Sequence, residues 1–255
     1  LRFGPQTVGG IVNYITPEPT EELSGRAQVS IGTRDYLGVD ASFSTNGFYV
    51  HGSHKQGDGA RDNTHLNQTD LFAKYVADIS ENQAITVRAN ILREDSDVGY
   101  TGITDAELAN FGSQYNPFGN DNFNIKHHAI SLTHEWRFGE GDELNTSFYY
   151  ADFLRDWWRQ SSTTTDTQCG NGFRDARFAD LAVDPDTCNS TQGRLRAFYT
   201  RGVEPRLTLH HGLFGSESTF EAGLRYHTEV QERIQLNGSS PNARSGTIAE
   251  DNRRE

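Results

Sequence analysis

Hydrophobic and polar residues alternate with a period of two along most of the chain, and this pattern constrains the fold more than any other feature. Side chains of a β-strand point alternately to its two faces, so the alternation predicts strands with one apolar and one polar face. About nine such runs occur, and the clearest lie at 27–31, 37–43, 71–75, 85–91, 130–138, 144–150 and 220–226. Several approach the ~9–11 residues of a tilted membrane-crossing strand. The pattern therefore predicts an all-β chain.

The connections between these runs alternate between short and long. Short ones lie at 46–47, 78–82, 139–143 and 211–216, and long polar ones lie at 57–68, 95–124, 156–194 and from Gln231 onward. Arg34-Asp35 is a short turn where this rhythm requires a long loop. Tight turns at one end and long loops at the other are typical of outer-membrane barrels, whereas a soluble sandwich distributes its loops over both ends.

The polar strand faces allow two interpretations. They line a water-filled lumen if the chain forms a barrel, and they face solvent if it forms a soluble sandwich. The loop rhythm favours the lumen. His134 falls on the apolar row, so either it lies near a membrane interface or the strand register slips there.

Composition excludes some classes of protein. The 255 residues are 34% hydrophobic and carry a formal charge of −12. No stretch approaches the ~20 apolar residues that a membrane-spanning helix needs. The acidic balance argues against nucleic-acid binding, which requires a basic surface. The chain begins with Leu1 and contains no Met, which we interpret as an internal piece of a longer protein.

Three stretches resemble a known family. The segment 2–16, RFGPQTVGGIVNYIT, resembles the end of the plug domain of TonB-dependent outer-membrane receptors. The segments 199–206, YTRGVEPR, and 239–247 resemble the ferric-citrate receptor branch of that family. The resemblance implies the C-terminal end of a plug domain over 1–19 and the N-terminal portion of a transmembrane β-barrel over 20–255. About 9–10 strands of an antiparallel barrel of about 22 strands would be present.

The resemblance also implies a function. A receptor of the bacterial outer membrane would bind an extracellular ferric chelate, with ferric citrate favoured, and import it with energy transmitted by TonB. The expected partners are ferric citrate or another ferric siderophore, outer-membrane lipid, and TonB through a plug region that precedes this segment. Neither enzymatic activity nor a cofactor is expected. The alternatives are the same receptor class with another siderophore, a cobalamin or a sugar as cargo, and a soluble all-β binding module.

Candidate ligand-binding residues follow from the same resemblance. Arginines of the ferric-citrate branch bind the anionic complex, and local alignment matches two of them to Arg155 and Arg196. Arg244 stands in for a third, in a segment that is a few residues shorter here. Bidentate hydrogen bonds between arginine and carboxylate are among the stronger polar contacts. Alternatively, an inward arginine at a strand end pairs with carboxylates of the lumen.

Cysteines and histidines complete the set of candidates. Cys169 and Cys188 lie in the longest predicted extracellular loop, where a disulfide suits an oxidising environment. The nine histidines include the pairs 51/54, 127/128 and 210/211, whose members face opposite sides of a strand. We therefore expect no metal site. No nucleophile elbow or phosphate-binding glycine loop appears, so no spacing selects a catalytic site.

Overall fold

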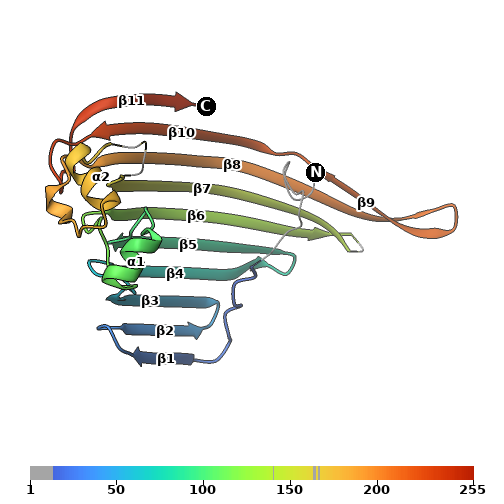
Figure 1. Ribbon diagram of the computed structural model, residues 1–255. Coiled ribbons are helices and arrows are strands. Elements are labelled where there is room, and N and C mark those ends of the chain that lie inside the picture. Colours follow the sequence, from blue (N-terminus) through green and yellow to red (C-terminus); the bar gives the residue numbers. More distant parts are fainter. Residues whose placement is uncertain (1–13, 140, 163–164, 166) are drawn as a thin grey trace.

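The computed structural model describes residues 14–139, 141–162, 165 and 167–255. Its strands form one antiparallel sheet, and two short helices lie in the connections (Figure 1). The elements are β1 Ser24–Ile31, β2 Leu37–Thr45, β3 Phe48–Asp58, β4 His65–Ser80, β5 Gln83–Ser96, α1 Asp105–Phe111, β6 Asn122–Phe138, β7 Asp142–Arg159, α2 Asn171–Phe178, η1 Pro185–Thr187, β8 Gln192–Leu213, β9 Ser216–Gly223, β10 Tyr226–Asn237 and β11 Thr247–Arg254. The expected plug segment, 1–19, lies mostly outside the described residues and stays a prediction.

The sheet is a meander in which each strand pairs with the next, and β9 and β10 together form one long strand. Both face β8 in a single register: Gly223 opposes Arg206, and Tyr226 opposes Val203. The break between them lies opposite Pro205, which has no N–H to donate to the ladder. The N–H of Leu224 still donates to the Pro205 carbonyl at 3.1 Å. The described chain therefore holds ten barrel-type strands, and the predicted all-β fold class is confirmed.

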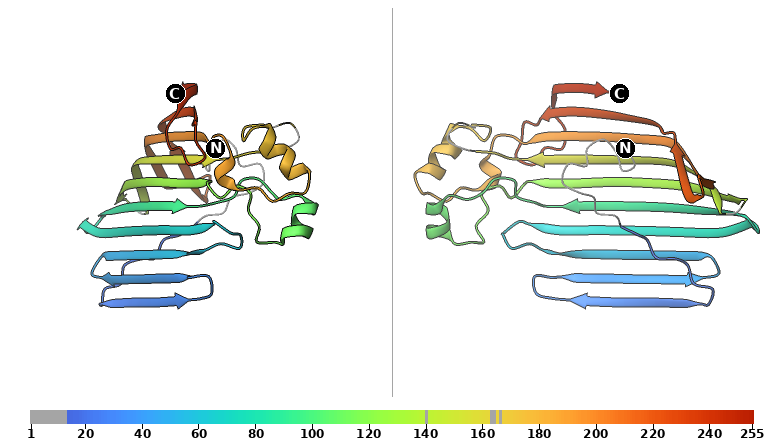
Figure 2. Two further views of the ribbon diagram at one scale, coloured as in Figure 1. Left: turned by 60° about the vertical axis from the view of Figure 1, so that its left-hand side comes forward. Right: turned by 90° about the vertical axis from the view of Figure 1, so that its right-hand side faces the viewer.

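Turns and loops separate to opposite ends of the sheet, as the spacing predicts (Figure 1). The β2–β3 turn is Asn46-Gly47, and both residues have positive φ, the conformation that this dipeptide readily adopts. The β5–β6 and β7–β8 loops carry α1 and α2 at the other end (Figure 2). Arg34 and Asp35, both with positive φ, lie in the expected short turn between β1 and β2.

The chain that precedes β1 identifies the inner face of the sheet. Lys74 on β4 is 1% exposed, and its ammonium contacts the Glu18 carboxylate at 2.6 Å and the Pro17 carbonyl at 3.3 Å. Thr20 N–H donates to the Ser44 hydroxyl of β2 at 2.8 Å. The segment before β1 thus lies against the face that carries Lys74 and Ser44.

The opposite, outer face carries exposed apolar rows. Ile130 on β6 is 52% exposed and Phe148 on β7 is 49% exposed. His134 shares this face, so the strand register does not slip there. It pairs with Ile85, next to the start of β5, and its ring contacts the Gln83 side chain at 3.0 Å. His134 therefore lies close to the turn end of the apolar rows.

A buried cluster joins the two helix-bearing loops. Phe118 of the β5–β6 loop packs against Phe173 of α2 and against the Cys169–Cys188 disulfide, whose Cα atoms are 4.2 Å apart. Glu107 of α1 receives two hydrogen bonds from the Arg177 guanidinium of α2, at 2.6 and 2.7 Å. Burial alone raises the pKa of Glu107, but these bonds hold it below its ordinary value. The two loops therefore form one packed unit, here called the loop layer (97–121, 160–162 and 167–191).

Among the described residues, no helix has the length and apolarity needed to cross a membrane.

Candidate functional site

Three arginines form a row across the inner face, close to its loop end. Arg196 on β8 lies directly opposite Arg155 on β7 and also directly opposite Arg233 on β10. All three lie on the face that carries Lys74, because the strand pairs from β4 to β10 keep one register between Lys74 and the loop end; the shift between Asp78 and Ser80 lies beyond Lys74, at the turn end. Cβ atoms of directly opposed residues are about 4.5–5.5 Å apart, and like charges in such positions destabilise a sheet. These residues are called the arginine row below.

Among the described residues, no carboxylate lies close enough to pair with the arginine row, although the charge of Glu250 on β11 acts on Arg196 from a greater distance. Within the described part of the chain, none of its guanidiniums forms an ion pair within 4.0 Å. The Nε–H groups of Arg155 and Arg233 are buried and have no hydrogen-bond partner there. Arg196 donates to the carbonyl of its neighbour Leu195 at 3.0 Å. An unpaired buried donor is costly, and more so when it is charged, so the row is chemically suited to bind an anion.

Two more guanidiniums lie closer to the loops, that of Arg194 by one cross-strand position and that of Arg159 by two. Arg194 on β8 opposes Trp157 of β7, and Arg159 at the end of β7 opposes Gln192. Both guanidiniums donate to the Gln192 amide oxygen, Arg194 at 3.1 Å and Arg159 at 3.5 Å. The inner face therefore holds five arginines in three successive cross-strand positions.

Aromatic side chains border the arginines on both sides. Below the row, Phe153 and Phe198 oppose each other, with ring centroids 6.1 Å apart. Above it, Trp157 meets the Tyr100 ring edge-on at 5.0 Å, and the Arg159 guanidinium lies 4.0 Å from the Tyr100 ring centroid. The site thus combines cationic donors with flat apolar surfaces.

The structure places Arg244 in the β10–β11 loop, away from the cross-strand row. Its guanidinium donates to the Asn120 carbonyl of the β5–β6 loop at 3.0 Å. The negatively charged carboxylates of Asp97, Asp121 and Asp95 attract this guanidinium electrostatically. Arg155 and Arg196 are brought together, whereas Arg244 connects two loops above them.

Asp121 links the loop layer to the site. Its two carboxylate oxygens accept the N–H groups of Gln160, at 2.5 Å, and of Tyr100, at 3.0 Å. It is 1% exposed, and this burial raises the pKa of Asp121 to about 7 even though both hydrogen bonds favour the ionised form. Asp121 therefore holds the two loops together where they adjoin Arg159.

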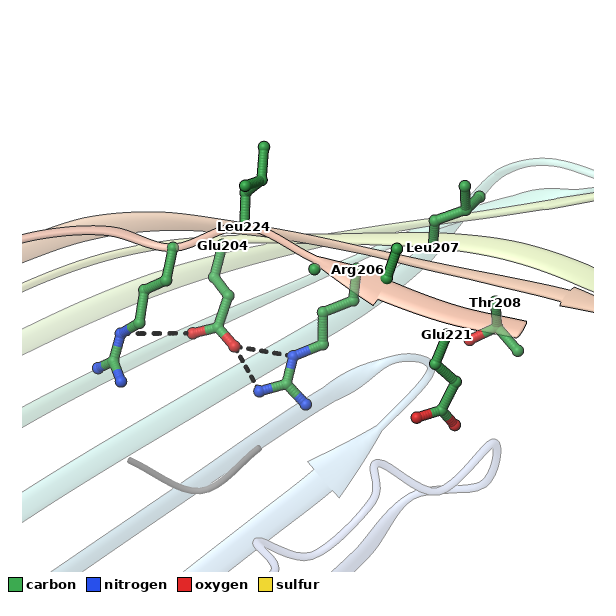
Figure 3. A pocket seen from close by; sticks show the side chains of 9 residues that line it. Glu204, Arg206, Leu207, Thr208, Glu221 and Leu224 are labelled. Atoms are coloured by element: carbon green, nitrogen blue, oxygen red, sulfur yellow. Dashed lines mark hydrogen bonds and ion pairs between the residues drawn. The ribbon is translucent and has the colours of Figure 1, made fainter. Parts of the chain in front are cut away.

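A cavity of about 460 Å³ lies at the turn end, and its arginines, unlike those of the arginine row, contact a carboxylate (Figure 3). Arg206 donates to the Glu204 carboxylate at 2.7 Å, and Arg225 lies 3.6 Å from the same carboxylate. The arginines here already share an anionic partner, unlike the arginine row. Over the described residues, no group of three His, Cys, Asp or Glu side chains is placed to hold a metal ion.

The sequence analysis missed Arg194, Arg233 and Arg159. Arg233 was missed because a loop was expected from Gln231 onward, and that expectation is wrong: β10 continues to Asn237 and pairs with β11. Glu232 interrupts the apolar alternation of Val230, Ile234 and Leu236, which obscures the strand. The signal for Arg194 was its spacing of two from Arg196, which places both on one face.

The fold of this chain resembles those of known proteins. No protein-family model matches the sequence, and no curated protein is significantly similar to it. Solved structures, however, match almost the whole chain, and they are receptors and a transporter rather than enzymes. The sheet therefore has the fold of part of a TonB-dependent receptor β-barrel.

Three of these structures illustrate the match. The ferric citrate transporter FecA superimposes with a TM-score of 0.74 over 99% of this chain, at 17% identity. BauA, the ferric preacinetobactin receptor of Acinetobacter baumannii, gives 0.65 over 93% at 10% identity. The ferripyoverdine receptor of Pseudomonas aeruginosa gives 0.61 over 93% at 12% identity. The chain spans 36%, 36% and 31% of their lengths, respectively.

Proposed function

We propose that this chain is part of a bacterial outer-membrane receptor that binds an anionic ferric chelate and imports it with energy supplied through TonB. The observation that carries the proposal is the arginine row, in which Arg155, Arg196 and Arg233 lie side by side without a carboxylate partner in the described chain. At the turn end, by contrast, Glu204 contacts both Arg206 and Arg225.

The barrel-type fold supports the membrane location and the transport role. Exposed apolar rows on the outer face suit lipid, while the polar inner face suits a lumen. A soluble binding module would leave these rows in water, where a contiguous apolar surface favours aggregation. The segment before β1, which covers Lys74 on the inner face, lies where a plug domain would join the barrel.

Ferric citrate is the favoured cargo. Complexes of citrate with ferric iron are anionic and present several carboxylates. Guanidinium groups bind carboxylates through two parallel hydrogen bonds. In this proposal Arg155 and Arg196 contact the ligand with Arg233, and Arg244 contributes from the loop above.

A second candidate cargo is another anionic ferric siderophore that contains aromatic groups. Phe153, Phe198 and Trp157 favour it, because they place flat apolar surfaces directly beside the guanidiniums. Aromatic rings stack on such surfaces and add to the electrostatic attraction.

The proposal is tested by calorimetry on the protein expressed from its complete open reading frame and purified in detergent. Ferric citrate should bind at micromolar concentration or tighter, and an uncharged ferric hydroxamate should not. The double variant Arg155→Ala/Arg196→Ala should weaken ferric citrate binding about a hundredfold or more, because removing each arginine removes its charged hydrogen bonds to the ligand. Arg206→Ala is the matched control, since this inner-face arginine of β8 already pairs with Glu204. Equal affinity of the double variant and the control contradicts the proposal.

A further inference from the structure

A pair of guanidiniums at the loop end of the site shares one neutral acceptor. Arg194 and Arg159 both donate to the Gln192 amide oxygen, at 3.1 and 3.5 Å. Gln192 begins β8 and lies directly opposite Arg159. Two positive charges therefore converge on an atom that has no formal charge.

The pair has unused hydrogen-bonding capacity. Arg159 is 7% exposed, and its Nε–H has no partner among the described residues. The neighbouring Trp157 Nε1–H is likewise buried and unpartnered there. Neither guanidinium forms an ion pair within 4.0 Å in the described chain, and the carboxylates of Glu250 and Asp121 act on Arg194 and Arg159 only from a greater distance. Buried cationic donors in this state are stabilised strongly by an anion that reaches them.

We propose that Arg159, Arg194 and Gln192 form a second anion subsite, which binds one carboxylate group of a polycarboxylate ligand. A glutamate in place of Gln192 would have nearly the same shape and would neutralise the pair internally. With glutamine there, the charge of the pair stays available to a ligand.

The position of the subsite suits the approach of a ligand from the loops. The Tyr100 ring covers one face of Arg159, at 4.0 Å, while Gln192 and Arg194 are only half-buried. A carboxylate therefore reaches the subsite from the side of Arg194. Arg194 and Arg196 are two residues apart on β8, a spacing of about 7 Å. One ligand with several carboxylates can therefore contact the subsite and the arginine row together.

The inference rests on the proposed function for the identity of its ligand, and its test separates the two. Binding of iron-free citrate and of ferric citrate is measured by calorimetry at low ionic strength, with the protein from its complete open reading frame. Gln192→Glu should weaken both by at least tenfold, because the new carboxylate occupies the subsite. Arg206→Ala, which alters an inner-face arginine of β8 outside the subsite, should bind both within about threefold of the unaltered protein. Thermal unfolding of both variants checks that they remain folded.

The outcomes distinguish the two proposals. If Gln192→Glu binds both ligands as tightly as Arg206→Ala does, the subsite is overturned, while tight ferric citrate binding still supports the proposed function. If iron-free citrate binds and Gln192→Glu abolishes its binding, the subsite stands. This conclusion holds even if ferric citrate binds no more tightly than iron-free citrate. Equal affinity for the two ligands would reject ferric citrate as the cargo but not the subsite.

Discussion

At the scale of single residues, the candidate site depends on repulsion that the fold tolerates. Arg196 has an arginine directly opposite it on each side, and like charges in these positions disfavour the folded sheet. The Lys74–Glu18 contact and the Arg206–Glu204 contact show that other inner-face cations of this chain have anionic partners. In the proposed function, the unpaired row is therefore where stability is sacrificed for ligand binding.

This trade-off can be tested by reversing one charge. In Arg196→Glu, the new carboxylate faces Arg155 and Arg233, and each opposite-charge pair contributes roughly 0.2–1 kcal/mol. We expect the ligand-free protein to unfold at a higher temperature than the unaltered protein, with ferric citrate binding lost. Arg196→Gln, which removes repulsion without adding attraction, should lie between them in stability. A lower unfolding temperature for Arg196→Glu than for Arg196→Gln contradicts this account.

At the scale of elements, the loop layer is a folded unit with its own small core. Phe118, Phe173 and the Cys169–Cys188 disulfide fill it, and the buried Glu107–Arg177 pair joins α1 to α2. A disulfide that closes a loop of this length stabilises by about 3 kcal/mol in the chain-entropy account. These contacts hold Tyr100 and Arg159 at the edge of the site, so the loop layer forms one wall of it.

The junction between the two loops should be sensitive to pH through Asp121. Its pKa in the folded protein, about 7, lies above its ordinary value of 3.8, so folding favours the protonated form. The stability that it contributes is fully present below about pH 4 and is lost as the pH rises towards 7. We expect hydrogen-exchange protection of the Gln160 and Tyr100 amides, corrected for intrinsic rates, to fall at least tenfold from pH 4 to pH 8. In Asp121→Asn, which cannot ionise, protection should not change over this range, and the same fall in that variant would assign the effect to another group.

At the scale of the whole molecule, the described sheet has two edges. β1 and β11 each pair on one side, so each presents unpaired backbone groups on the other. Barrel closure removes such edges, and the similar structures are about three times longer than the matched chain. The outer apolar rows and the open edges of the described sheet are surfaces that favour aggregation in water.

Expression of the segment by itself tests this view. Residues 1–255 produced without detergent should aggregate, because the β1 and β11 edges and the outer apolar rows are exposed. The product of the complete open reading frame should be monodisperse in detergent by size-exclusion chromatography. A soluble, monomeric segment in plain buffer would instead favour the alternative of a soluble all-β binding module.

The sequence alone determined most of the strands, their two faces and the separation of turns from loops, but not the end of β10 or β11. These properties are local: the two-residue period orients each side chain, and dipeptides such as Asn46-Gly47 set their own turns. Resemblance also indicated Arg155 and Arg196. The tertiary structure decided which distant residues are neighbours. Arg155, Arg196 and Arg233 align because the pairing of β7, β8 and β10 sets their register, and no local pattern encodes how strands separated by long loops align.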